Sequence, residues 1–275
     1  MTETAPQNAM PGEATIEEIG PPPRSYRNQL LRIASFLTVM IAWELLGRQV
    51  APLFMSYPTA IAAAAVTMTA DGELIQGLLV SLETLLLAFA ISAVLGIGFG
   101  LAIGRYRAFE AMTDWLVNAL YATPLVAVIP LVILWLGLGF AAKLFIVILL
   151  AIFPILINTA SGVRNVSESL IDVGTAFAAT EREVFTKIIL PAALPYMMTG
   201  LRLGIGRAII GMVVAEFFTA ITGLGALIIK YGNQYDTASM FVPILVLMGL
   251  GILLTAIVRR AEIWIAPWKT TEDDE

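Results

Sequence analysis

The sequence of 275 residues contains no cysteine and no histidine. Disulfides, metal sites built on Cys or His, histidine general bases and cysteine nucleophiles are therefore excluded. Charged residues are also scarce, at 13% of the chain, whereas soluble domains carry roughly 25%. Hydrophobic residues make up 59% of the chain, and the mean hydropathy is +0.86. This composition is typical of a membrane protein, so we expect contact with membrane lipid and no nucleic acid partner.

A phosphate-binding loop is missing as well. Such a loop ends in Gly-Lys followed by Ser or Thr, but the four lysines follow Ala142, Thr186, Ile229 and Trp268. No nucleophile is paired with a base either, so we expect no enzyme, no catalytic residue, no metal site and no bound cofactor. Energy for any transport must then come from a partner protein or from an ion gradient.

Six apolar stretches are candidates for membrane spans, each of which needs about 20 residues. We predict spans at about 33–46, 78–104, 115–136, 144–159, 197–220 and 241–258. The expected fold is therefore an all-α membrane protein with six transmembrane helices. Pro124, Pro130 and Pro154 lie inside the third and fourth spans and would open backbone carbonyls there. Such openings suit a translocation path, although packing kinks are the commoner reason for a proline.

The remaining segments divide the chain. Residues 1–29 are predicted to form a disordered cytoplasmic tail, followed by the first transmembrane helix within 30–51. Residues 52–77 are predicted to be extracytoplasmic or interfacial, with a helix start at Pro58 and a turn at Asp71-Gly72. Residues 78–263 form the core, in which a turn at 223–225 precedes a re-entrant or interfacial piece that runs to Met240. Residues 264–275 form a second cytoplasmic tail.

The distribution of basic residues predicts the orientation. Six spans place both termini and the 105–114 and 160–195 loops on one side. That side holds 13 of the 16 Lys and Arg residues when Arg202 and Arg207 are included, and only Arg48, Lys143 and Lys230 lie on the other. Under the positive-inside rule, both tails and the 160–195 loop are cytoplasmic.

Two groups of residues within the spans have candidate roles. Gly96, Gly100 and Gly104 recur every four residues, a small-residue ridge that predicts close packing of another helix rather than a ligand site. Arg202, Arg207 and Glu216 share the fifth span, where ionisable residues are costly unless they are paired or hydrated. They line an anion pathway or stabilise the span. We favour the structural role for both arginines, because the sequence places them near the cytoplasmic end, and we expect a partner for the deeper Glu216.

The polar segment 162–195 interrupts these apolar stretches. Ser167 is a candidate N-cap for a helix whose apolar stripe comprises Val166, Leu170, Val173 and Phe177. Thr180 and Glu183 fit a capping box for a second short helix, which Pro191 and Pro195 should stop or kink. A helix pair at the water side of a membrane offers a surface to a partner.

The spacing of this segment resembles the cytoplasmic loop of ABC importer permeases, in which Glu-Ala-Ala, three residues, Gly, nine residues, Ile, one residue and Leu-Pro follow one another. Alignment on Leu190 and Pro191 places Ile188 on the pattern's Ile and Ala178 on its Gly. Asp172, Val173 and Gly174 then stand on its Glu-Ala-Ala. The following stretch, LPAALPYMMTGLRLGIGRAIIGMVVAEF, is similar to the nitrate, sulfonate and taurine branch of that family.

The resemblance implies a fold, partners and site residues. The fold would be that of a type I importer permease in a bacterial inner membrane, with cytoplasmic coupling helices. The partners would be two cytoplasmic ATPase subunits that use ATP with Mg, an extracytoplasmic binding protein, and a second permease copy in a homodimer. The coupling residues would be Asp172, Val173, Gly174, Ala178, Ile188, Leu190 and Pro191. The solute would be an anion such as a sulfonate, nitrate, taurine or bicarbonate, with thiamine-precursor-like heterocycles and aromatic carboxylates as further candidates.

A stand-alone ion-coupled carrier or channel is the alternative. It predicts an inverted internal repeat and a cluster of acidic residues at the membrane midplane. The sequence shows no such repeat, and its buried charges are few and scattered.

Overall fold

The computed structural model describes residues 26–219 and 221–266, and every regular element in that part of the chain is a helix. The α-helices are α1 (Tyr26–Gln49), α2 (Pro58–Ala70), α3 (Glu73–Arg105), α4 (Arg107–Ala122), α5 (Ile129–Leu136), α6 (Phe140–Arg164), α7 (Glu168–Ala176), α8 (Glu181–Val184), α9 (Leu190–Thr219), α10 (Leu224–Asn233) and α11 (Thr237–Ile265). A 3₁₀ turn at Leu125–Val128 precedes α5, and a π turn at Phe185–Ile189 joins α8 to α9.

Six spans are present if bent helix pairs are counted as single spans. Among the described residues, α1, α3, α6 and α11 are each long and apolar enough to cross a membrane alone. The α4–α5 pair is bent by 88°. The second pair is bent by 47° and consists of the helix Glu181–Thr219, which includes α8 and α9, and of α10. The predicted third span at 115–136 is therefore a broken one. Pro124 cannot donate a backbone hydrogen bond, and the helix ends at Ala122 before it resumes beyond the 3₁₀ turn.

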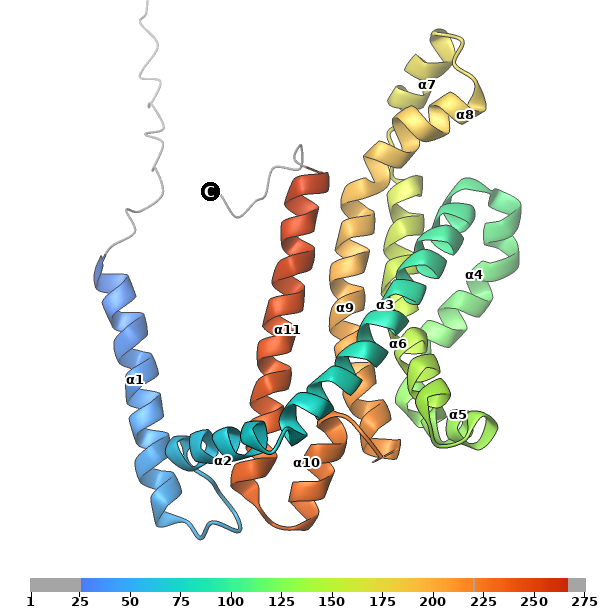
Figure 1. Cartoon of the computed structure of the whole chain (residues 1–275). Helices are drawn as coiled ribbons and strands as arrows, with labels where there is room; N and C mark the ends of the chain where they lie inside the picture. The colour runs from blue at the N-terminus through green and yellow to red at the C-terminus, as the bar shows by residue number, and fades with distance from the viewer. Residues whose placement is uncertain (1–25, 220, 267–275) are drawn as a thin grey trace, which may run out of the picture.

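Helices α3, α6 and α9 form the centre of the molecule, as Figure 1 shows. Small side chains bring these helices together: Ala88, Ala151 and Ala208 are fully buried in one apolar cluster with larger residues such as Leu85 and Met212. Gly96, Gly100 and Gly104 all face α6, where an added Cβ would lie 2.9, 2.6 and 2.6 Å from Ile155, Thr159 and Val163. Side chains larger than hydrogen would force these two helices apart.

Helix α2 lies across one end of the spans (Figure 1). It begins at Pro58 and is followed by a turn at Asp71 and Gly72, where Gly72 has a φ of +76°, as the sequence predicts. Ile61 and Met68 of α2 pack on Leu224 of α10 and Val242 of α11. Helix α1 stands apart from the central helices and presents an exposed apolar surface along most of its length.

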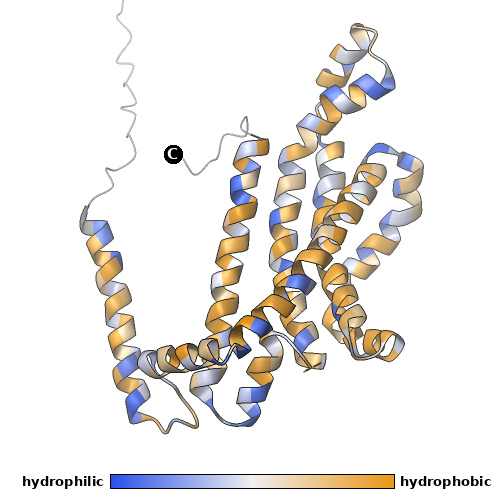
Figure 2. Cartoon of the chain, in the orientation of Figure 1, coloured by the Kyte–Doolittle hydropathy of each residue, from blue (hydrophilic) through white to orange (hydrophobic). Residues whose placement is uncertain are grey.

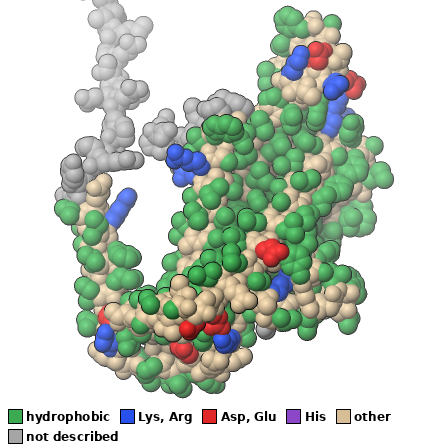
Figure 3. Space-filling model, in the orientation of Figure 1, with side chains coloured by type: hydrophobic (Ala, Val, Ile, Leu, Met, Phe, Trp, Pro, Cys, Tyr) green, Lys and Arg blue, Asp and Glu red, His purple; other side chains and the backbone are tan. Residues whose placement is uncertain are grey.

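The surface shows the pattern of a membrane protein. Apolar residues dominate the helices between the two ends of the molecule (Figure 2). On the face drawn in Figure 3, charged side chains gather mainly at the two ends. Both tails are shorter than the predicted 1–29 and 264–275, because α1 begins at Tyr26 and α11 continues to Ile265. The rest of both predicted tails, 1–25 and 267–275, lies outside the described residues.

Candidate functional site

The polar segment 162–195 forms a helical hairpin that projects beyond the ends of the neighbouring spans (Figure 1). It consists of α7, α8 and the π turn, and we call it the hairpin below. Ion pairs connect it and its base to the core: Arg105 at the end of α3 lies 3.5 Å from Glu181, and Arg164 at the end of α6 pairs with Glu110 of α4. The first pair joins the hairpin to α3, and the second joins α6 to α4 at the base of the hairpin.

Only one of the two predicted helix caps has the expected hydrogen bonds. The Thr180 hydroxyl accepts from the Glu183 amide at 3.3 Å, while the Glu183 carboxylate accepts from the Thr180 amide at 3.0 Å. The predicted capping box is confirmed. Ser167 occupies the N-cap position of α7, but its hydroxyl lies 2.7 Å from the Ser169 hydroxyl and makes no capping bond. The prediction of a Ser167 cap is correct in position and wrong in its hydrogen bond.

The turn between α7 and α8 explains what residue type position 178 needs. The Ala179 amide donates to the Gly174 carbonyl at 3.0 Å, and the Ala178 amide donates to the Thr175 carbonyl at 2.9 Å. These two bonds define a Schellman motif, which places its C′ residue in the left-handed region. Ala178 accordingly has a φ of +54°. Glycine adopts this backbone conformation without a steric cost, and alanine does not.

Helix α7 has an inward and an outward face. Gly174 is buried, and an added Cβ there would lie 2.7 Å from the Ile188 side chain. Its small size thus lets α7 pack on the π turn of the same hairpin. Beyond Val166 the predicted stripe is exposed: Leu170, Val173 and Phe177 are exposed by 48%, 52% and 82%. Asp172 is exposed on the same helix, so the free surface of α7 combines apolar groups with a carboxylate.

The chain passes from the hairpin into α9 without a stop. The Leu190 amide donates to the Phe185 carbonyl, an i to i−5 bond that widens the helix at this point. Pro191 follows directly after this π turn as the second residue of α9 and has no backbone N–H to donate to the preceding turn. The sequence predicts that Pro191 and Pro195 stop or kink the helix. They do not stop it, so that part of the prediction is wrong. The hairpin is therefore connected to the centre of the molecule by continuous helix.

The two arginines of α9 differ in their surroundings. Arg202 forms an ion pair with Glu262 of α11 at 3.5 Å, which fits the predicted structural role. Arg207 makes no ion pair with a carboxylate in the described part of the chain. Five residues separate the two, a rotation of about 140° around a helix with 3.6 residues per turn, so they face different neighbours. Along α9, Arg207 lies near the middle of the helix, and Arg202 lies five residues closer to the hairpin.

Arg207 lines a cavity of about 400 Å³. The other lining residues come from the break between α4 and α5 and from the middle of α6: Tyr121, Thr123, Pro124, Leu125, Val126, Leu150, Phe153 and Pro154. The rings of Tyr121 and Phe153 lie 6.3 Å apart, in a tilted arrangement. The cavity thus combines one cationic group with aromatic and apolar surface.

Glu216 has the partners that a buried carboxylate needs. Its side chain is fully buried, and its two oxygens accept hydrogen bonds from the Ser81 hydroxyl and the Gly225 amide, both at 2.7 Å. Gly225 belongs to α10, which corrects the predicted turn at 223–225: the chain turns before α10, and Gly223, with a φ of +107°, is its N-cap. Periodicity within one span could not reveal Ser81, which lies 135 residues earlier.

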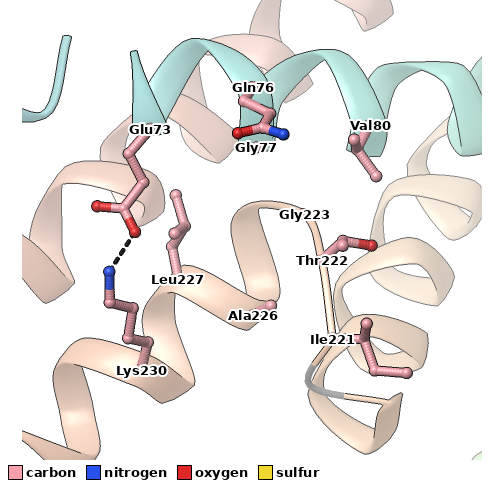
Figure 4. A pocket seen from close by; sticks show the side chains of 10 residues that line it. All are labelled: Glu73, Gln76, Gly77, Val80, Ile221, Thr222, Gly223, Ala226, Leu227 and Lys230. Atoms are coloured by element: carbon pink, nitrogen blue, oxygen red, sulfur yellow. Dashed lines mark hydrogen bonds and ion pairs between the residues drawn. The ribbon is translucent and has the colours of Figure 1, made fainter. Parts of the chain in front are cut away.

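A second cavity of about 440 Å³ lies between α3, the 221–223 segment and α10. At its edge the carboxylate of Glu73 points toward the ammonium group of Lys230, with which it forms an ion pair (Figure 4). Tyr231 also donates a hydrogen bond to Glu73. This cavity lies at the end of the molecule opposite the hairpin, and its charged groups are already paired with each other.

Comparison with known proteins identifies the family. The family model of binding-protein-dependent transport system inner membrane components matches residues 93–266. The chain belongs to this family, the permease subunits of ABC importers. It is a multi-pass membrane protein that forms the membrane component of such a system and is not an enzyme. Nothing in these comparisons supports the alternative of a stand-alone ion-coupled carrier.

Two relatives and one solved structure show the extent of the similarity. The formylaminopyrimidine transport permease protein ThiX of Halalkalibacterium halodurans is 30% identical over 235 residues, which are 85% of this chain and 94% of ThiX. The putative aliphatic sulfonates transport permease protein SsuC of Escherichia coli (strain K12) is 34% identical over 242 residues, 86% of this chain and 92% of SsuC. A chain of the inward-facing methionine ABC transporter MetNI has the same fold, with a TM-score of 0.56 and 21% identity. That match covers 72% of this chain and 98% of the MetNI chain.

Proposed function

We propose that this chain imports a small organic sulfonate and that the hairpin couples its spans to ATP hydrolysis by two cytoplasmic ATPase subunits. The observation that carries the coupling role is the outward face of α7. Leu170, Val173 and Phe177 are exposed apolar residues at one tip of the molecule, and the exposed carboxylate of Asp172 lies on the same helix, about 100° around it from Val173. An amphipathic helix of this kind fits an apolar groove, and a carboxylate at its edge can pair with Arg or Lys of the partner.

The hairpin is built to transmit force. Gly174 packs on Ile188, the π turn continues into α9, and Arg105 connects the hairpin to α3. A displacement of α7 by an ATPase would therefore move α9 and α3 together. The positive-inside rule supports a cytoplasmic position for the hairpin and for both termini. The exposed apolar surface of the spans supports assembly with a second copy of the chain, alongside contact with lipid.

The solute class is supported by one relative and by one side chain. SsuC is named for the transport of aliphatic sulfonates, and Arg207 places an unneutralised cationic group in a cavity near the middle of α9. An extracytoplasmic binding protein would deliver the solute. A formylaminopyrimidine is the second candidate, because ThiX is named for its transport.

Purification from native cells in mild detergent tests the coupling role. We expect an ABC ATPase subunit to accompany the tagged wild-type chain. We expect recovery of the ATPase to fall at least tenfold for Asp172→Arg, which places a positive charge opposite the partner's Arg or Lys, and for Phe177→Asp, which places a charge in the apolar contact. Asp71→Arg is the matched control: it reverses an exposed charge at the opposite end of the molecule and should retain the ATPase. A preparation without any ATPase, or one that is unaffected by both hairpin variants, would contradict the proposal.

Solute uptake tests the substrate. Proteoliposomes that contain the complete transporter and its binding protein should accumulate radiolabelled butanesulfonate only when ATP is present on the hairpin side. Accumulation of a formylaminopyrimidine instead, without butanesulfonate uptake, would assign the chain to the other candidate.

A further inference from the structure

Arg207 lies in an unusual position for an unpaired cation. It follows Leu190, the first residue of α9, by 17 residues and precedes Thr219, the last, by 12, so it is near the middle of the helix. Pro154, which lines the same cavity, is likewise near the middle of α6. An arginine at this depth is costly in lipid and is found beside a partner or a water-filled space. Since no carboxylate among the described residues pairs with it, the cavity beside it must supply water or an anion.

The backbone around the cavity independently indicates that it is hydrated. The chain breaks between α4 and α5 and turns by 88° at residues that line the cavity. On the opposite wall, Pro154 cannot donate a hydrogen bond to the carbonyl of Leu150, four residues earlier in α6. Irregular backbone at membrane depth is tolerated only where it is covered by protein or borders a water-filled cavity. The regular helical hydrogen bonding is therefore interrupted on two sides of the space that Arg207 lines, which fits a hydrated cavity.

The chemistry of the lining selects one class of ligand. Arg207 is the only lining residue among those described that carries a full charge, and its guanidinium group can donate two parallel hydrogen bonds to an oxyanion. Tyr121 and Phe153 provide aromatic surface beside it, which suits a short apolar chain. The cavity of about 400 Å³ is within the range of small-molecule sites, roughly 300–1,000 Å³.

We infer that this cavity is a transient site on the translocation path, in which Arg207 binds the oxyanion group of the solute while Tyr121 and Phe153 contact its apolar part. The inference rests on the proposed function for the direction of transport and for the choice of a sulfonate. Arg202 has no such role, because Glu262 already neutralises it on another face of α9. The site selects for negative charge, and a neutral solute of the same size would gain nothing from Arg207.

Cysteine labelling tests the site whichever solute the transporter carries. The chain contains no cysteine, so Val126→Cys places a single thiol in the exposed lining of the cavity. The complete transporter in membrane vesicles is treated with either of two methanethiosulfonates of similar size, one with a sulfonate group and one with a trimethylammonium group. We expect both to react, and the anionic reagent to be favoured. The ratio of the anionic to the cationic rate constant should fall roughly tenfold when Arg207→Gln is added, because a nearby positive charge is removed. Arg202→Gln is the matched control and should leave the ratio unchanged.

Each result is decisive for the site. A thiol that is inert to both reagents would show a dry cavity and overturn the inference, as would a rate ratio that ignores Arg207→Gln. Butanesulfonate should slow the labelling of the Val126→Cys protein and should not slow it after Arg207→Gln. If the wild-type transporter does not import butanesulfonate but the charge selectivity at Val126 still depends on Arg207, the sulfonate assignment fails and the anion site stands. If Arg207→Gln abolishes butanesulfonate uptake while ATPase stimulation by the loaded binding protein persists, both are supported.

Discussion

The hydroxyl of Ser81 in α3 donates a 2.7 Å hydrogen bond to the carboxylate of Glu216 in α9, and both side chains are fully buried. The same hydroxyl accepts a hydrogen bond of 2.8 Å from the Leu224 amide at the start of α10. One oxygen atom thus joins three helices at the end of the bundle remote from the hairpin. A buried carboxylate is tolerated here because each of its oxygens has a donor, Ser81 for one and the Gly225 amide for the other.

Ser81→Ala should therefore destabilise the protein by about 1–3 kcal/mol, because it leaves a buried carboxylate oxygen and a buried amide each without a partner. Thermal unfolding in detergent measures this as a lower midpoint. Ser92→Ala is the matched control: Ser92 is equally buried in α3, but its shortest hydrogen bond, 2.8 Å, goes to the Ala88 carbonyl of its own helix. Equal losses for the two variants would show that the contact with Glu216 has no special weight.

Gly100 and Gly98 of α3 offer a second matched pair. A Cβ added at Gly100 would lie 2.6 Å from Thr159 and 2.7 Å from the Leu156 carbonyl, whereas one added at Gly98 has nothing within 4 Å. Gly100→Ala should cost about 1–3 kcal/mol of stability, because the helices must separate. Gly98→Ala should be neutral or stabilising by up to about 1 kcal/mol, since alanine favours the helix. Unfolding midpoints of the two variants in detergent should move in opposite directions or differ by several degrees; a loss at both positions would contradict the packing argument.

Features that depend on neighbours in sequence were predictable. The four-residue spacing of Gly96, Gly100 and Gly104 places them on one face of any helix, and a Thr followed three residues later by Glu specifies a capping box from local geometry alone. The family could also be predicted, because its loop pattern lies between long apolar spans. The apolar stripe of α7 was correctly located, although only the structure shows that Leu170, Val173 and Phe177 point outward.

Features that depend on distant contacts were not predictable. Arg202 and Arg207 appear equivalent in the sequence, and only the approach of α11 with Glu262 separates the paired residue from the unpaired one. Pro124 within an apolar stretch is compatible with a kink or a break, and packing of the following helix on α6 decides for the break. The partner of Glu216 requires α3 and α9 to lie side by side, which no local pattern encodes.

The two N-cap positions of the hairpin, Ser167 and Thr180, should contribute differently to its local stability. Thr180→Ala removes a hydroxyl that accepts from the Glu183 amide and should destabilise the start of α8 by about 1 kcal/mol. Ser167→Ala should have a smaller effect on α7, because the Ser167 hydroxyl contacts only the Ser169 hydroxyl. Hydrogen exchange of peptides that cover 168–190 measures both local changes. A larger acceleration for Ser167→Ala than for Thr180→Ala would contradict the hydrogen bonds described for these caps.

Ala178 provides a sharp test of the hairpin, because glycine is expected to stabilise the hairpin at this position and to destabilise it at a nearby control position. Its φ of +54° places a Cβ-bearing residue in a conformation that costs roughly 1–2 kcal/mol relative to the right-handed region. Ala178→Gly should recover about 1 kcal/mol and slow hydrogen exchange in α7 about fivefold where exchange follows opening of the hairpin. Ala176→Gly, at the last residue of α7, should accelerate exchange instead, because Ala176 is helical and glycine disfavours the helical conformation. If both glycines accelerate exchange, the left-handed turn does not limit the stability of the hairpin. If Ala178→Gly slows exchange and Ala176→Gly accelerates it, the alanine that stands at the position of the family's glycine makes the hairpin less stable than glycine would. The ATPase should then bind the Ala178→Gly protein at least as tightly as the wild type.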